Sequence, residues 1–206
     1  MIDHLVYTVP QLEAALDDLE TRLGVRPVMG GYHDTRGTKN ALVKLDQGIY
    51  LEILAADDTN TAVAPPRWMG VDLLTGAKLT RWAMKPDDLP AAATLLCGHD
   101  PLMGEIVAGS RKVAGGGELR WRMTLPLAGP EVEVVPFLID WSETEELPYD
   151  GLPEMGCGLV KLVVVHPNPE VIGPLLARLG AEVVVEEGAE VKLRAVLRCP
   201  NGTLEI

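Results

Sequence analysis

The sequence is poor in aromatic residues and in cysteine. Phe, Trp and Tyr make up 4% of its 206 residues, so a hydrophobic core has to rest on Val, Leu, Ile and Ala. Cysteine occurs three times, at Cys97, Cys157 and Cys199. None of them belongs to a closely spaced pair of the kind that binds zinc or carries out redox chemistry. We therefore expect three reduced cysteines without a functional role.

Basic residues and long apolar runs are also scarce. Lys and Arg number 18 against 30 for Asp and Glu, a formal net charge of -12. An acidic protein repels phosphate backbones and anionic lipids, so we predict neither nucleic acid nor a membrane as a partner. No segment approaches the roughly 18 apolar residues of a membrane helix, and the N-terminus does not resemble a secretory signal. These absences predict a cytoplasmic protein.

Motifs for covalent or phosphate chemistry are missing. The sequence has no Gly-x-Ser-x-Gly motif and no recognisable Cys-His pair, which argues against a covalent nucleophile. The glycine run 115–117 lacks the strand-to-helix context of a phosphate-binding loop and predicts a flexible hairpin tip. Proline-containing linkers are expected at 55–70 and 142–156.

The sequence does contain an internal repeat. Residues 4–24 and 161–180 each begin with an apolar run that stops at a proline, and each ends an amphipathic stretch on Arg-Leu-Gly. Strand-like residues follow in both copies, as the paired segments 40–45 with 194–199 and 48–53 with 202–206. The pattern predicts a strand-helix-strand-strand-strand unit at each end of the chain.

A weaker third copy is predicted between these two. It would consist of a strand at 79–86, a helix at 88–96 and strands at 118–123 and 131–139. The resulting fold class is α+β, with repeated βαβββ units in curved mixed sheets. The predicted domains are 1–142, with units at about 1–57 and 78–142, and an additional C-terminal half unit at 157–206.

A further signal comes from five segments of the chain, residues 2–7, 36–42, 50–53, 121–122 and 136–141. They resemble the glyoxalase-like domain family of the vicinal oxygen chelate superfamily. The resemblance implies the fold and leaves the reaction open, because the superfamily includes isomerases, dioxygenases, epimerases and resistance proteins. In its metal-using relatives, two units each supply a ligand on the first strand and a carboxylate on the last.

By this resemblance the first unit offers His4 and Glu52 as metal ligands and catalytic residues. The other units depart from the pattern, with Lys161 and Thr80 where a second neutral ligand is expected, although Glu205 is kept. The resemblance thus implies one divalent ion, zinc, iron, nickel or manganese, and the absence of any metal is equally compatible. Without metal, a buried His-Glu pair could still act as general acid and base.

Other polar residues are candidates for substrate binding. Arg120 and Arg122 share one face of a strand, opposite Trp121. They could bind an anion in the cup that the curved sheet would form, or belong to a solvated face. Lys39 and Asn40 begin a strand beside the presumed cup and could orient a ligand. By contrast, the remaining histidines, His33, His99 and His166, are predicted to lie in loops without a role.

Two pairings of the units remain open. In one arrangement the first and central units close one cup. In the other, the first and third units bring His4, Glu52, Lys161 and Glu205 into one site. If Lys161 and Glu205 do not join such a site, they form an ion pair with each other or lie exposed. In the first arrangement the C-terminal half unit is left with an exposed apolar face, which predicts a homodimer through it.

The leading functional hypothesis is a lyase or isomerase that acts on a small oxygenated or anionic metabolite. The alternative is a binding protein that sequesters a small-molecule ligand, and a structural dimerisation module is the third possibility. All three fit the fold that the resemblance implies.

Overall fold

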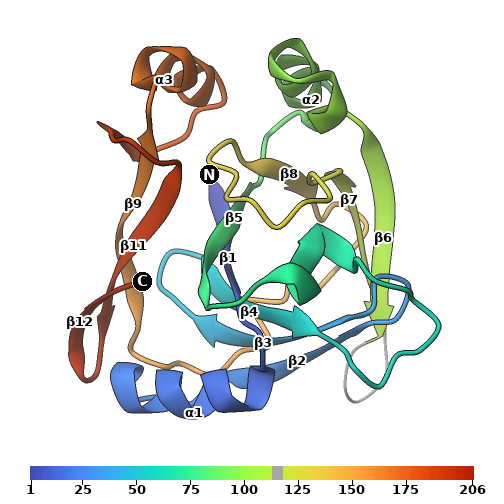
Figure 1. Cartoon of the computed structure of the whole chain (residues 1–206), viewed down its shortest axis with the longest axis vertical. Coiled ribbons are helices and arrows are strands. Elements are labelled where there is room, and N and C mark those ends of the chain that lie inside the picture. The colour runs from blue at the N-terminus through green and yellow to red at the C-terminus, as the bar shows by residue number, and fades with distance from the viewer. Residues whose placement is uncertain (113–117) are drawn as a thin grey trace.

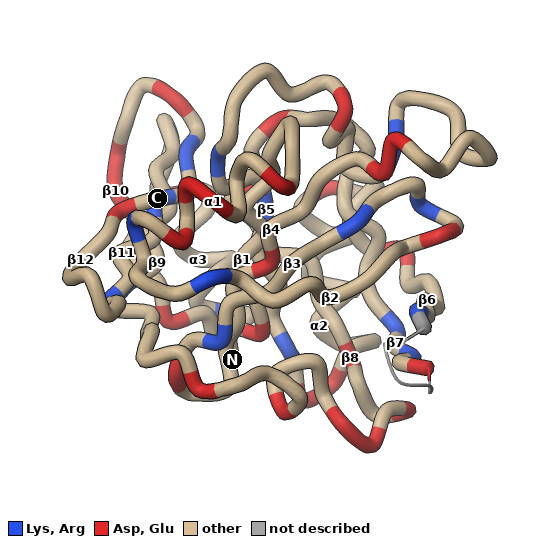
Figure 2. The backbone as a smooth tube through the Cα atoms, turned by 90° about the horizontal axis from the view of Figure 1, so that it is seen from below, with Lys and Arg blue, Asp and Glu red and all other residues tan. Residues whose placement is uncertain are grey.

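The computed structural model describes residues 1–112 and 118–206 and has an α+β architecture (Figure 1). Acidic residues are spread along the whole backbone, with basic residues between them (Figure 2). The predicted hairpin tip at 115–117 lies outside the described residues.

The main sheet is built from two segments of the chain. The N-terminal segment contains β1 (Ile2–Thr8), α1 (Leu12–Leu23), β2 (Val28–His33), β3 (Thr38–Lys44) and β4 (Tyr50–Ala56). The central segment contains two 3-10 helices, η1 (Trp68–Leu73) and η2 (Pro101–Met103), with β5 (Lys78–Met84), α2 (Leu89–His99), β6 (Ile106–Lys112), β7 (Glu118–Thr124) and β8 (Phe137–Asp140). The strand predicted at 131–139 is thus shorter and begins later.

The strand order of the main sheet is β2-β3-β4-β1-β5-β8-β7-β6. In the N-terminal half β1 is parallel to β4, and in the central half β5 is parallel to β8. The two halves meet where β1 lies antiparallel to β5. The first and central units therefore form one curved sheet, and the competing pairing of the first with the third unit is wrong.

The C-terminal segment forms a separate sheet. It contains β9 (Gly158–His166), α3 (Pro169–Arg178), β10 (Val184–Glu187), β11 (Lys192–Cys199) and β12 (Gly202–Glu205), which is the predicted order of elements. Its strand order, however, is β10-β9-β11-β12, and β9 is parallel to β10 rather than to the last strand. This segment is therefore no topological copy of the first unit. The clearer sequence repeat reflects similar local patterns, and strand pairing depends on tertiary packing that such patterns do not encode.

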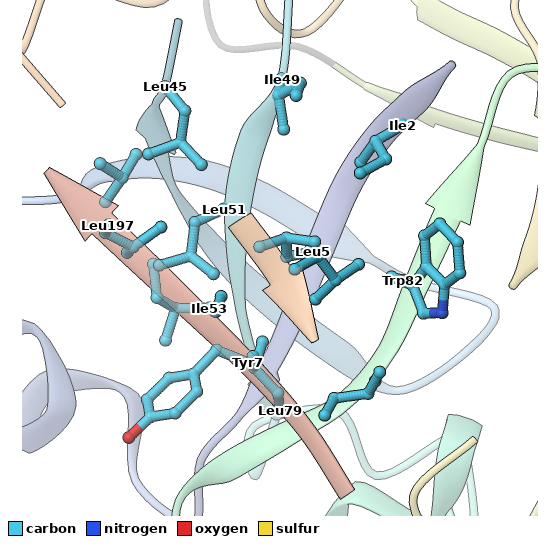
Figure 3. Packing of buried hydrophobic residues seen from close by; sticks show 14 of the residues in the cluster. Ile2, Leu5, Tyr7, Leu45, Ile49, Leu51, Ile53, Leu79, Trp82 and Leu197 are labelled. Atoms are coloured by element: carbon cyan, nitrogen blue, oxygen red, sulfur yellow. The ribbon is translucent and has the colours of Figure 1, made fainter. Parts of the chain in front are cut away.

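The two faces of the main sheet bury different side chains. Alternation along β4 sends Leu51 and Ile53 to the convex face and Glu52 to the concave face. The C-terminal sheet covers the convex face, where Leu197 of β11 packs near Leu51 and Ile53 (Figure 3). The expectation that this segment exposes its apolar face is therefore wrong. The homodimer stays a prediction, without that argument for it.

Two cysteines that are distant in sequence become neighbours in the core. Cys157 and Cys199 are both buried, and burial together with the Cys199 thiol raises the pKa of Cys157 to about 12. A thiol in such surroundings is neutral and a poor nucleophile. None of the described helices is both long and apolar enough to cross a bilayer.

Candidate active site

The site is centred on His4 of β1, which is 4% exposed on the concave face of the main sheet. Its Nδ1 lies 2.6 Å from Asp3 Oδ1, and a carboxylate can only accept in such a bond, so Nδ1 carries the proton. Neighbouring residues in a regular strand point to opposite faces, but the register of β1 on β5 shifts between Ile2 and His4. This irregularity brings the two side chains together.

Glu52 of β4 lies on the other side of the His4 ring. Its Oε2 is 3.6 Å from His4 Nε2, and its Oε1 accepts a hydrogen bond of 2.5 Å from Asn40 Nδ2. Both Glu52 and Asn40 are buried. His4 Nε2 therefore faces the pocket beside a carboxylate whose orientation is fixed.

Aromatic rings hold the imidazole of His4 in place. Tyr50 stacks on it with ring centroids 4.7 Å apart and an interplanar angle of 17°, and Phe137 approaches edge-on at 5.4 Å. The indole N–H of Trp141 donates to Asp3 Oδ2 at 3.0 Å and so fixes the carboxylate as well. Burial raises the pKa of Tyr50 well above its usual value, and the charges of Asp3 and Glu52 raise it further. The phenol therefore stays neutral.

Arg111 of β6 brings a positive charge to the same pocket. It is 8% exposed and donates through Nη1 to the carbonyl of Gly30 on β2, so it links the two edge strands across the mouth of the sheet. Burial lowers the pKa of the Arg111 guanidinium, and the nearby Glu52 charge opposes this shift. An arginine remains protonated at neutral pH in spite of such a shift.

These residues line a narrow inner pocket with a polar and an apolar half. The N-terminal segment supplies most of its polar side chains, His4, His33, Asn40 and Glu52, and Arg111 comes from the central segment. The central segment supplies mainly apolar ones, among them Trp121, Met123, Phe137 and Ile139. The cavity volume is about 30 Å³, which leaves room for a water molecule or a similarly small group.

A larger outer cleft adjoins the inner pocket. Its cavity volume is about 580 Å³, and it shares His33, Trp68, Trp121 and Met123 with the inner pocket. His33 hydrogen-bonds through Nδ1 to Thr38 Oγ1 at 3.0 Å and lies edge-on to Trp68 with ring centroids 5.5 Å apart. The prediction of an exposed loop histidine is therefore wrong: His33 ends β2 and is buried.

The structure places several predicted substrate-binding residues outside the inner pocket. Lys39 binds Glu13 of α1 at 2.8 Å, because it neighbours the inward-facing Asn40 and points the other way. Trp121, rather than the arginines beside it, faces the pocket. Arg122 binds Asp140, and Arg120 binds Glu118 at the rim of the outer cleft.

The polar residues of the C-terminal segment do not join the site. Lys161 and Glu205 are both exposed, and each is paired in register with Val196, on opposite sides of it. Glu205 lies 3.6 Å from Arg194 instead. Lys161 and Glu205 therefore lie exposed, as one of the two alternatives predicted, and do not form an ion pair with each other.

Several residues of the site escaped the sequence analysis, among them Asp3, Arg111, Trp68 and His33. Of these, the sequence pattern predicts a place only for His33, as a loop histidine without a role. Gly30 of β2 leaves space for the Asn40 side chain, because a Cβ at position 30 would come within 2.4 Å of Asn40 Oδ1.

The donor set does not fit a metal centre of the type that the family resemblance implies. His4 Nε2 and Glu52 supply two ligands, whereas a protein metal site normally has three or four. The central segment contributes Phe137 and Ile139 to the pocket where a second pair is required. Within residues 1–112 and 118–206, no group of three His, Cys, Asp or Glu side chains is placed to hold a metal ion. His4 and Glu52 thus lie together without a second pair of metal ligands from the central segment.

The burial of His33 predicts a loss of stability in mild acid. Burial lowers the pKa of His33 below its value of about 6.5 in an unfolded chain. Below that pH the unfolded chain binds a proton that the folded protein refuses, so the folded state is destabilised as the pH falls, by at most about 1.4 kcal/mol per pH unit for one group. Urea unfolding at pH 7.5 and 5.5 should show a smaller difference for His33→Gln than for the wild type. Equal differences would contradict the assignment, and His99→Gln, at an exposed position, is the control.

A comparison with solved structures finds one that shares the fold over most of the chain and others that are less similar. A solved structure of a hypothetical protein from Staphylococcus aureus is similar with a TM-score of 0.62 and 17% identity, over 93% of this chain and 87% of that one. Methylmalonyl-CoA epimerase from Mycobacterium tuberculosis gives a TM-score of 0.42 and 17% identity, over 67% and 85% of the two chains. A mutant of 4-hydroxymandelate synthase from Streptomyces coelicolor gives 0.49 and 13%, over 99% and 61%.

Among curated proteins, no sequence matches this chain. The model of the glyoxalase-like domain family matches residues 2–180, which include the whole main sheet and the first strand and helix of the C-terminal segment. The chain therefore belongs to the glyoxalase-like domain family.

Proposed function

We propose that this protein is an isomerase or lyase that transfers a proton next to the carbonyl group of a small anionic metabolite, with side chains alone as acid and base. The observation that supports the proposal best is the buried series Asp3–His4–Glu52, with contacts of 2.6 and 3.6 Å. Such a series sets the tautomer of the histidine and leaves one ring nitrogen free to accept a proton.

Each residue then has a defined task. His4 Nε2 removes the proton from the carbon beside the carbonyl group, and Asp3 stabilises the imidazolium that results. Arg111 stabilises the negative charge that moves to the carbonyl oxygen, since an oriented cation in a site with little water acts strongly on such a charge. Glu52, oriented by Asn40, exchanges a proton with His4 or with the neighbouring carbon.

Proton exchange with solvent tests the proposal directly. A panel of short aldehydes, ketones and 2-oxo acids would be incubated with the protein in D2O, and the loss of the proton next to the carbonyl would be followed by proton NMR. We expect exchange with at least one class of compound, at a rate that EDTA treatment does not change. Loss of exchange after EDTA, with recovery on addition of one divalent ion, would show that a metal takes part and would contradict the side-chain mechanism.

One observation favours the alternative, a binding protein that sequesters its ligand. The outer cleft is far larger than the inner pocket, so a ligand can occupy it without reaching His4. Tight binding of a compound in the panel without any exchange would support this second function.

A further inference from the structure

We propose that the outer cleft is a binding subsite for a planar aromatic group that carries a single carboxylate, the non-reacting end of the substrate. The cleft has a cavity volume of about 580 Å³ and joins the inner pocket at His33, Trp68, Trp121 and Met123. A ligand that fills it can therefore present its other end to His4. This assignment of the two ends rests on the proposed function, whereas the subsite itself is tested by binding alone.

The first argument is a cation without an acidic partner. Of the described arginines that are at least partly buried, all except Arg36 and Arg111 have a carboxylate oxygen within 4.0 Å. Both exceptions line the site, Arg36 in the outer cleft and Arg111 in the inner pocket. In a chain with a net charge of -12, whose acidic residues lie all along the backbone (Figure 2), two such cations at one site provide binding positions for an anion.

The second argument is the aromatic lining. The guanidinium carbon of Arg36 lies 5.7 Å from the ring centroid of Trp68, within the range of a cation-π contact. This contact orients the guanidinium and leaves its N–H groups for a carboxylate. Trp68 and Trp121 both line the cleft, so a flat ring can lie against an indole there.

Trp121 is held rigidly, as a binding wall requires. It packs on Trp141 with centroids 5.4 Å apart, and it lies against Gly109 of β6. A Cβ at position 109 would come within 2.4 Å of the indole Nε1, so glycine is the residue that allows this position of the ring. The ring is therefore in place before a ligand arrives, which limits the entropy lost on binding.

The third argument limits the charge of the ligand to one. The cleft lining also holds Arg120, which is paired with Glu118, and the exposed carboxylate of Glu143, which repels a second negative charge. Burial lowers the pKa of His33, so at neutral pH this ring adds no positive charge to the cleft. These charges fit a carboxylate better than a phosphate, which carries nearly two charges at pH 7.

The test is a set of binding measurements with three matched probes. They are 2-naphthoate, its neutral planar counterpart 2-naphthamide, and its saturated counterpart decahydronaphthalene-2-carboxylate, each titrated by calorimetry. We expect 2-naphthoate to bind at least about tenfold more tightly than either counterpart, which corresponds to one charge-assisted contact or one stacked ring. In Arg36→Gln the preference for naphthoate over naphthamide should disappear, and in Trp68→Leu the preference over the saturated acid should disappear.

The controls separate this proposal from the proposed function. His4→Asn should keep the affinity for 2-naphthoate within about twofold, because the probe does not need the reacting groups. Arg178→Gln removes an exposed arginine on α3 and should change nothing. Equal affinities for naphthoate and naphthamide in the wild type, or an unchanged preference in Arg36→Gln, would overturn the subsite whatever the exchange experiment shows.

Discussion

Replacement of His4 by Gln is expected to lower the rate of proton exchange by about 10³-fold, within the range that a positioned general base contributes. The amide cannot accept the proton that Nε2 takes, although it is polar and similar in length. The measurement is the NMR exchange rate under saturating substrate. His99→Gln, which changes an exposed histidine at the end of α2, should keep the wild-type rate.

A second variant guards against a trivial loss of folding. Asp3→Asn keeps His4 but removes the charge that stabilises the imidazolium and fixes its tautomer, so the exchange rate should also fall, by about 10²-fold or more. Thermal unfolding would show whether each variant is folded. A folded His4→Gln protein that exchanges protons at the wild-type rate would exclude His4 as the base.

Replacement of Arg81 by Met is expected to destabilise the folded protein by about 3–5 kcal/mol, the usual cost of removing one partner of a buried ion pair. Arg81 is 1% exposed, lies 3.0 Å from Glu133 Oε1, and donates to the carbonyls of Leu127, Gly129 and Glu131. Without it the Glu133 carboxylate and these carbonyls lose their buried donor. Urea unfolding at pH 7 would measure the loss.

The pair Arg81 and Glu133 allows a double-mutant cycle as the control. Burial raises the pKa of Glu133 and the charge of Arg81 opposes this, so Glu133→Gln should recover part of the stability in the Arg81→Met background. Additive losses would show that the two side chains act independently and would contradict the argument.

The loop between β7 and β8, which contains the carbonyls bound by Arg81, also supports the outer cleft. Gly70 in η1 packs so closely on the loop that a Cβ would come within 2.8 Å of the Pro130 nitrogen. Because η1 begins at Trp68, which lines the outer cleft, the loop that Arg81 holds also fixes the position of Trp68. Some of the loss in Arg81→Met should therefore appear as weaker binding in the cleft.

Local elements of the fold were predictable because they depend on local patterns. The apolar spacing of residues 12–23 predicts α1, and a proline-terminated apolar run predicts β1. The pairing of units was not encoded in this way. The C-terminal segment matches the first unit in sequence, yet its strands pair differently and cover the convex face. Which strand lies beside which depends on packing between segments far apart in the chain.

The site was predictable to the same extent. The family resemblance placed His4 and Glu52 together, and the structure has both on the concave side of neighbouring parallel strands, β1 and β4. Asp3 could not, because strand alternation sends it to the opposite face and only the irregular register brings it back. Arg111 reaches the site across the mouth of the sheet, from an edge strand that no motif marks.

The division of the pocket into a polar and an apolar half also has an evolutionary consequence. The side chains that we propose to transfer protons come from residues 2–56, and most of the apolar surface comes from residues 106–141. Substitutions in the second stretch can change which molecule is accepted while the acid and base stay where they are. Descendants of such a chain could therefore acquire new ligands by drift in one half, under continued selection for reactivity in the other.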